Sequence, residues 1–192
     1  MNMEALISSH LAEHLATVEK LHAHTAFIAD LAQRVLTSLN AGGKVLFFGN
    51  GGSAADAQHL AAELVVRYRQ NRRALPGIAL TTDTSILTAG GNDFGFDSIY
   101  ARQVEALARP GDVVIGISTS GNSANVVNGL IEAKRQGCLA VAFTAESGGQ
   151  CASLADLAFR APSTVTARAQ ECHLLVGHML CDIIEEALVA VG

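Results

Sequence analysis

Apolar positions in the first forty residues recur at the three- and four-residue spacing that is typical of amphipathic helices. Gly42 and Gly43 follow the second series, as glycines commonly follow a helix C-terminus. The spacing predicts two helices over residues 1–41, arranged as a hairpin and used in packing and oligomerisation. The two series are Leu6, Leu11, Leu15, Val18 and Leu21, and then Ile28, Leu31, Val35 and Leu39.

From residue 42 onward, short apolar runs are separated by helical stretches. The runs lack internal alternation, which indicates strands that are buried on both faces and joined through helices. This pattern predicts an α/β fold, a three-layer αβα sandwich with a five-stranded parallel sheet, and a long C-terminal helix from about Ala167 to Val191. We expect a single domain over residues 1–192, with its α/β core over 42–192. The apolar runs are 45–48, 78–80, 113–117, 139–143 and 157–159.

Composition and charge narrow the classes of partner. Of the 192 residues 49% are hydrophobic, 5% are aromatic and 18 are glycine, which suits helices packed on a sheet through tight turns. The formal net charge of -5 argues against a nucleic-acid partner, because affinity for the phosphate backbone requires clustered Lys and Arg. The one basic cluster, residues 67–73, is interpreted mainly as a solvated turn.

The cysteines and the N-terminus bear on localisation. Cys138, Cys151, Cys172 and Cys181 are scattered without a Cys-x-x-Cys pair, which indicates buried thiols in a reducing compartment. The N-terminus lacks a basic region followed by an apolar stretch, and no segment has the length of a membrane-spanning helix. We therefore expect a cytoplasmic protein with no membrane partner.

Two segments, 43–53 and 111–123, both read as strand, then Gly/Ser/Asn loop, then helix. This similarity between the two segments can be explained by a true duplication or by a chance likeness between two strand-to-helix turns. In either case both loops are expected at the carboxyl ends of parallel strands, where open α/β sheets bind their ligands.

The second of these loops has the chemistry of a phosphate site. Its hydroxyls, its glycine and the N-terminus of the next helix offer hydrogen-bond donors and a favourable dipole to one anion. A helix cap alone would need only Asn122 or Ser123, so we predict that the loop binds a phosphate monoester. The hydroxyl side chains are Ser118, Thr119, Ser120 and Ser123.

Nucleotide-binding fingerprints are incomplete. Residues 118–123 lack the Gly-Lys-Ser/Thr ending of a nucleoside-triphosphate loop. The first loop, Gly49-Asn-Gly-Gly-Ser53, lacks the last glycine of a dinucleotide fingerprint because Ala54 stands there. The predicted ligand is therefore a sugar phosphate.

Four polar residues after the first loop are spaced three, four and four apart, as one stripe of a helix would be. A solvated helix face is the alternative interpretation. The stripe begins at a ligand-type loop, has apolar flanks, and contains His59 and Glu63 at i and i+4, which could hold a metal or share a proton-transfer task. It comprises Asp56, His59, Glu63 and Arg67.

The final helix carries four polar residues into an otherwise apolar segment. A lone histidine in such a place is more often a hydrogen-bonded core residue than a catalyst. The four are Gln170, Glu171, His173 and His178.

Taken together, these motifs identify a family. The chain resembles, over essentially its whole length, the sugar isomerase (SIS) domain family and within it the phosphoheptose isomerases, which interconvert sedoheptulose 7-phosphate and D-glycero-D-manno-heptose 7-phosphate. The motifs are Gly-Asn-Gly-Gly-Ser53, Asp56-Ala-Gln-His59, Glu63, Arg67-Tyr-Arg, Asn92-Asp-Phe-Gly-Phe96, Gly116-Ile-Ser-Thr-Ser-Gly-Asn-Ser123 and Gln170-Glu-x-His173 with His178.

The resemblance implies roles for particular residues. It implies an αβα fold, a homotetramer with active sites at subunit interfaces, Glu63 and His178 as the acid/base pair, and heptose synthesis for lipopolysaccharide core or another surface glycan. Phosphate would be held by Ser118, Thr119, Ser120 and Ser123. The sugar would be contacted by Asn50, Gly51, Gly52, Ser53, Arg67, Asp93 and Gln170. One Zn²⁺ per subunit would be bound by His59, Glu63, Gln170 and His178.

Three points stay open at this stage. Ala167 stands where some members have an aspartate near the sugar, although its neighbour Arg168 is retained. Gln170 and His178 are separated by roughly 12 Å of continuous helix, which is too far for both to bind one ion from a straight segment. Either the helix starts late or bends, or two chains contribute to each site. A Glu63 that binds zinc is also a poorer base.

Three other readings compete with this one. Some relatives of the fold are tetramers that bind a replication-initiator protein without catalysis, but by resemblance they lack the residues matching Glu63 and His178. Sugar-phosphate sensors usually carry an added domain, for which no residues remain here. An isomerase of a shorter sugar phosphate, such as a pentose 5-phosphate, is the alternative among enzymes.

His10 and His14 are interpreted as exposed surface, since no acid is evident nearby in the sequence.

Overall fold

A computed structural model of the chain describes residues 2–190. Its centre is a five-stranded sheet in the order β2-β1-β3-β4-β5, in which every pair of neighbours is parallel. The predicted sheet is therefore confirmed, and each strand lies at one of the apolar runs. The strands are β1 (Val45–Gly49), β2 (Gly77–Ala79), β3 (Val113–Ile117), β4 (Leu139–Thr144) and β5 (Leu157–Arg160).

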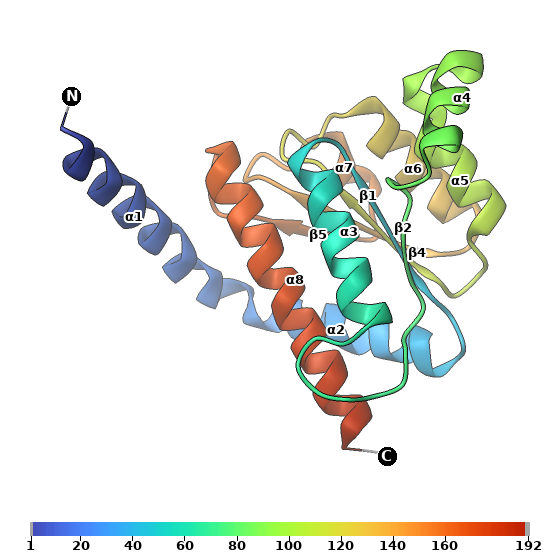
Figure 1. Cartoon of the computed structure of the whole chain (residues 1–192), viewed down its shortest axis with the longest axis horizontal. Coiled ribbons are helices and arrows are strands. Elements are labelled where there is room, and N and C mark those ends of the chain that lie inside the picture. Colours follow the sequence, from blue (N-terminus) through green and yellow to red (C-terminus); the bar gives the residue numbers. More distant parts are fainter. Residues whose placement is uncertain (1, 191–192) are drawn as a thin grey trace.

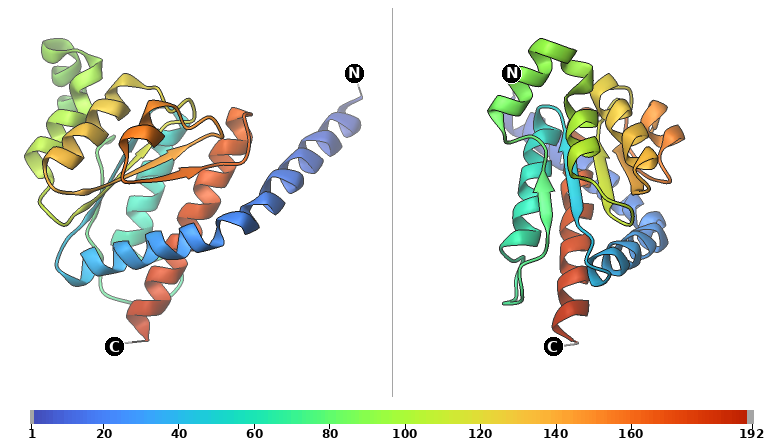
Figure 2. Two further views of the ribbon diagram at one scale, coloured as in Figure 1. Left: turned by 180° about the vertical axis from the view of Figure 1, so that it is seen from behind. Right: turned by 90° about the vertical axis from the view of Figure 1, so that its right-hand side faces the viewer.

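Helices cover both faces of the sheet, as Figures 1 and 2 show. Successive strand residues point to opposite faces, so Val45 and Phe47 pack in one apolar core while Leu46 and Phe48 pack in the other. The first core is closed by α2 (Thr25–Asn40), α3 (Gly52–Val65) and α8 (Thr166–Val189). The second is closed by α5 (Ile99–Leu107), α6 (Ala124–Arg135) and α7 (Gly149–Leu154).

The N-terminal helices do not form the predicted hairpin. Helix α1 (Met3–Glu19) is joined to α2 by the 3₁₀ helix η1 (Lys20–His24), and α1 projects away from the body instead of folding back (Figures 1 and 2). The prediction was wrong because periodicity defines an apolar face but not the direction of the next helix. The large apolar side chains of α1 remain exposed: Met3, Leu6, Ile7, Leu11 and Leu15.

Helix α1 is attached to α8 by polar contacts. His14 Nδ1 lies 2.6 Å from Glu171 Oε2, and Arg168 donates to the carbonyl of His10 at 2.7 Å and to Glu171 at 2.6 Å. His10 is exposed, as expected, whereas His14 is half-buried and pairs with Glu171, which lies 157 residues away in the sequence.

Four further points concern the fold. Helix α4 (Thr84–Phe94) and the 3₁₀ helix η2 (Phe96–Ser98) contain no buried residue. The predicted end of the last helix, Val191, lies outside the described residues. All four cysteines are buried and free, as expected. Within residues 2–190, no helix is long and apolar enough to cross a membrane.

Candidate active site

Two glycine- and serine-containing loops lie side by side at the carboxyl edge of the sheet. Strands β1 and β3 are neighbours, with Gly49 paired to Ile117, so the loops that follow them start at the same level. Between these loops and the beginning of α8 is a cavity of about 140 Å³. It is lined by Asn50, Ser53, Ile117, Ser118, Thr119, Ser123 and Gln170.

The hydroxyls of the second loop do not cap the helix that follows it. Ser123 is the N-cap residue of α6, but its side chain makes no capping hydrogen bond. It instead accepts a hydrogen bond from the hydroxyl of Ser118 at 3.1 Å. Ser120 is exposed, does not line the cavity, and accepts a hydrogen bond from the Asn122 N–H at 3.2 Å. The hydroxyl-lined cavity beside a helix N-terminus suits a phosphate group.

A buried polar network that the sequence analysis missed links the two loops. The amides of Asn50 and Asn125 donate to each other at 2.8 and 2.9 Å. Tyr100 is buried and donates its hydroxyl to the carbonyl of Gly49, and burial raises its pKa to about 12. Asn125 lies two positions after Ser123, the last residue of the phosphate-type loop, and this proximity was the one available signal. Nothing in the local sequence marks Tyr100.

Gly52 provides a close contact between the first loop and α8. A Cβ at this position would lie 2.5 Å from Nε2 of Gln170, so a larger residue would displace that side chain. Gly51 has a φ of +57°, a backbone conformation that glycine adopts at little cost. The absence of a side chain at Gly52 thus allows Gln170 to reach the cavity.

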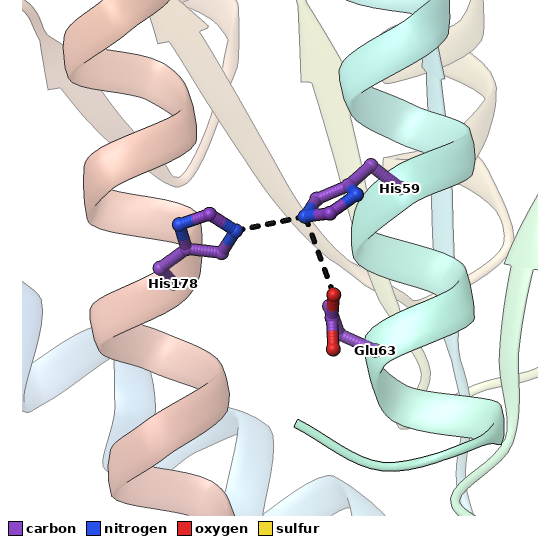
Figure 3. Close-up of side chains that lie close together, drawn as sticks. All are labelled: His59, Glu63 and His178. Carbon is purple, nitrogen blue, oxygen red and sulfur yellow. Dashed lines mark hydrogen bonds and ion pairs between the residues drawn. The ribbon is translucent and has the colours of Figure 1, made fainter. Parts of the chain in front are cut away.

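Further along the same two helices, His59, Glu63 and His178 converge (Figure 3). His59 Nε2 lies 2.8 Å from His178 Nε2 and 3.3 Å from Glu63 Oε1. The His59 side chain is 45% exposed and that of Glu63 19% exposed, so the group faces an accessible surface. The predicted acid and base, Glu63 and His178, therefore have ligand atoms within 4.8 Å of each other although 115 positions separate them in the sequence.

This group fits a zinc ion by its donor set. One ligand atom from each of its three residues lies within 4.8 Å of the others. Two imidazoles and a carboxylate are a combination that binds zinc in catalytic sites, where a further position stays open for water or substrate. Gln170, the fourth zinc ligand that the resemblance implies, is not part of this group within one chain; it lies at the cavity beside Gly52. Helix α8 is continuous from Thr166, so the late start considered above is excluded.

Other predicted site residues lie apart from this cluster. Helix α3 ends at Val65, so the polar stripe is shorter than predicted and Arg67 falls in the following loop, where it donates to Asn71 at 2.6 Å. Asp93 lies exposed on α4, where it accepts a hydrogen bond from the side chain of Asn92 at 2.7 Å.

Asp56 and His173 are the remaining polar residues of these helices. Asp56, the first residue of the stripe, is half-buried. Desolvation raises the pKa of its carboxyl group, and the nearby charge of His59 lowers it by a smaller amount. His173 is fully buried against β4 and serves as a core residue, as the sequence favoured for a lone histidine.

The fold and the site define a sugar-phosphate-binding α/β class, and comparisons with known proteins agree. The family model described as "SIS domain" matches residues 9–145. A phosphoheptose isomerase from Aquifex aeolicus is 60% identical over 159 residues, which are 83% of each chain. One from Paramagnetospirillum magneticum is 54% identical over 186 residues, covering 96% of this chain and 97% of that protein. The chain thus belongs to the phosphoheptose isomerase family of SIS domain proteins.

Solved structures show the same likeness. A phosphoheptose isomerase from Neisseria gonorrhoeae superposes with a TM-score of 0.90 at 41% identity, covering 96% of this chain and all of that one. One from Francisella tularensis gives a TM-score of 0.93 at 37% identity, covering 97% of this chain and all of that one. The fold described above is therefore the fold of this family.

Proposed function

We propose that this chain is an aldose–ketose isomerase that converts sedoheptulose 7-phosphate to D-glycero-D-manno-heptose 7-phosphate. The observation that carries the proposal is the meeting of His59, Glu63 and His178 on two helices that both begin at the hydroxyl-lined cavity. The family's name agrees with this activity. The product would serve lipopolysaccharide core or another heptose-containing glycan.

The cavity and the cluster are suited to opposite ends of one open-chain sugar. Six residues of α3 separate Ser53 from His59, and eight residues of α8 separate Gln170 from His178, which correspond to roughly 9 and 12 Å of helix. A phosphate among the serines would leave this length for the carbon chain. The separation favours a long sugar over a pentose 5-phosphate, which remains the alternative substrate.

The reaction moves a proton between C1 and C2. Glu63, as base, would remove a proton from C1 of the ketose, while His178, as acid, would protonate the carbonyl oxygen at C2 to give an enediol. Returning the proton to C2 and taking one from the oxygen on C1 completes the aldose without any external oxidant. The phosphate loop, and the sugar contacts of Asn50, Arg67, Asp93 and Gln170, would hold the chain in a reactive orientation.

Zinc would be held by His59, Glu63 and His178, with Gln170 as the expected fourth ligand. When bound, the ion supplies a Lewis acid that polarises a carbonyl oxygen. Glu63 as zinc ligand and Glu63 as free base are competing hypotheses. Because Gln170 lies at the cavity of its own chain, we propose that a second copy completes the site.

A zinc site completed by a second copy of the chain is consistent with a homotetramer whose active sites lie at subunit interfaces. The exposed apolar face of α1 supports such packing. The four buried, free cysteines support a reducing, cytoplasmic setting. The retained Glu63 and His178 argue against the non-catalytic module that binds a replication initiator.

The proposal is tested by an NMR time course of sedoheptulose 7-phosphate in deuterium oxide. Wild type should produce the aldose with deuterium at the transferred position, and Glu63→Gln should lower kcat by about 10²–10⁴-fold. Glu105→Gln, an exposed glutamate of α5, should turn over like wild type. No turnover by wild type, even with added Zn²⁺, would contradict the proposal. Turnover of a pentose 5-phosphate instead would establish the shorter-sugar alternative.

A further inference from the structure

Glu185 and Arg72 form a buried ion pair near the C-terminal ends of α3 and α8, further along these helices than the His59–Glu63–His178 cluster. Neither residue was among the predicted site residues. The Glu185 side chain on α8 is 1% exposed and that of Arg72, in the loop after α3, is 4% exposed. Arg72 Nε lies 3.3 Å from Glu185 Oε2, close enough for charge pairing but without hydrogen-bond geometry. Two charges removed from water in this way are costly to bury, and such pairs contribute little net stability on average.

Glu185 holds the loop that follows α3. Its carboxylate accepts the backbone N–H groups of Tyr68 at 2.9 Å, Arg69 at 2.6 Å and Gln70 at 2.5 Å. Burial opposes the charge, but these donors and Arg72 outweigh it and keep the pKa of Glu185 below its ordinary value. One carboxylate thus fixes three consecutive residues of the loop against α8.

Arg72 makes the complementary connection to α3. Its guanidinium donates to the carbonyl of Glu63 at 2.6 Å and to that of Leu64 at 2.8 Å. The last carbonyls of a helix have no partner within the helix, and a cation there satisfies them and suits the helix dipole. Arg72 therefore holds the backbone of Glu63, the proposed base.

The loop held by Glu185 reaches His178, the proposed acid. The Tyr68 ring packs on the His178 imidazole with centroids 5.5 Å apart and planes at 33°. The Tyr68 N–H is one of the three groups bound by Glu185. Glu185 and His178 are seven residues apart on α8, so they lie on nearly the same side of that helix.

We propose that the Glu185–Arg72 pair is a positioning device for the acid/base groups, acting on Glu63 through its backbone carbonyl and on His178 through Tyr68. Neither residue lines the cavity or belongs to the His59–Glu63–His178 cluster, so both act through other residues. This inference rests on the proposed function for its kinetic consequence, but its geometric consequence can be measured without any substrate.

The test is Glu185→Gln, which keeps an acceptor for the loop and removes the charge. At a temperature where the protein is folded, kcat should fall at least tenfold while KM for sedoheptulose 7-phosphate stays within twofold, because the phosphate cavity is untouched. The ring signals of His178 in a histidine-labelled NMR spectrum, recorded without substrate, should shift as the Tyr68 ring moves.

The matched control is Asp112→Asn. Asp112 is also buried and accepts two backbone N–H groups, from Lys44 at 2.9 Å and Arg109 at 2.8 Å, and pairs with the Lys44 ammonium. These partners lie outside α3, its following loop and α8. The control should lower the Tm and leave kcat and the His178 signals as in wild type.

A second variant keeps the inference testable should Glu185→Gln fail to fold. Tyr68→Leu removes the ring over His178 and leaves the backbone contact with Glu185 in place; it should shift the His178 signals and lower kcat at least fivefold. Unshifted His178 signals in the folded variants, or an equal loss of kcat in Asp112→Asn, would overturn the inference. An inactive wild type would contradict only the proposed isomerase activity. The NMR comparison of the His178 signals would still test the positioning role of the Glu185–Arg72 pair.

Discussion

His173 and His178 occupy the same helix, and their surroundings give them different chemistry. The His173 imidazole has no exposed area, and its Nε2 donates to the carbonyl of Thr144 at 2.9 Å. Its Nδ1 has no hydrogen-bond partner, so a proton added there would place a charge in the apolar core. Burial accordingly lowers the pKa of His173 to about 4. His178 faces His59 in the accessible cluster instead.

This difference predicts an acid-labile fold. Because the folded pKa of His173 lies below the ordinary value of 6.5, the unfolded chain binds more protons between about pH 6.5 and 4. The stabilisation is complete above pH 6.5 and is lost as pH falls to 4, by up to about 3 kcal/mol. Urea unfolding at a series of pH values should show this slope.

The control for the pH dependence is His173→Gln, which retains an N–H donor for Thr144 but does not titrate. Its free energy of unfolding should change less with pH across the same window. An identical slope in variant and wild type would show that other groups cause the acid lability.

At the scale of elements, the phosphate-type loop is held in shape by backbone packing against the start of α7. Gly121 has a φ of +67°, and a Cβ there would lie 2.1 Å from the carbonyl oxygen of Gly148. The Gly121 carbonyl also accepts the N–H of Cys151 at 2.8 Å. Both the turn and this close approach require glycine at the position.

Gly121→Ala should therefore damage the loop. The clash is with backbone and cannot be relieved by a rotamer change, so we expect a loss of about 1–3 kcal/mol in stability and a raised KM for the sugar phosphate. Thermal unfolding and initial-rate kinetics measure the two effects. In the comparison variant Gly91→Ala, on α4 with nothing within 4 Å of the added Cβ, the Tm should not fall. A Gly121→Ala protein with wild-type KM would contradict the assigned role of the loop.

Sequence patterns predicted the elements themselves well, because the spacing of apolar residues reflects local geometry. All five strands and the long last helix were found in this way. The end of α3 was missed by two residues, since the loop at Arg67 is fixed by Glu185 of α8 rather than by a local stop signal. The hairpin was wrong for a related reason: helix direction depends on what the apolar face meets.

At the scale of the whole molecule, α1 presents an apolar face that the described part of the chain does not cover. Leu11 and Leu15 are 59% and 67% exposed, and the helix projects outward (Figure 2). Continuous exposed apolar surface of this kind marks an interaction site. We propose a second copy as the partner, because Gln170 and His178 of one chain are too far apart to bind the same ion in the proposed zinc site.

The assembly is tested by light scattering coupled to size exclusion. Wild type should have the mass of four chains, and the double variant Leu11→Glu/Leu15→Glu should have a lower mass. Ile131→Glu, an exposed apolar residue of α6, serves as the matched control and should remain a tetramer. A monomeric wild type with full isomerase activity would contradict interfacial active sites.

The sequence by itself determined the class of fold and the chemistry of each segment. Apolar runs specify buried strands, and a contiguous hydroxyl-rich loop specifies a phosphate-type site, because both signals are contained in a few adjacent residues. The proposal of Glu63 and His178 as base and acid also rests on short motifs, by resemblance. These properties do not depend on how distant segments meet.

Only the tertiary structure decided which groups act together. His59 meets His178 across 119 positions, Asn50 meets Asn125 across 75, and Glu185 binds a loop about 115 residues earlier. No local pattern encodes such contacts, because they result from the strand order and from the packing of α3 against α8. The same packing placed Gln170 at the cavity and left Arg67 outside the polar stripe.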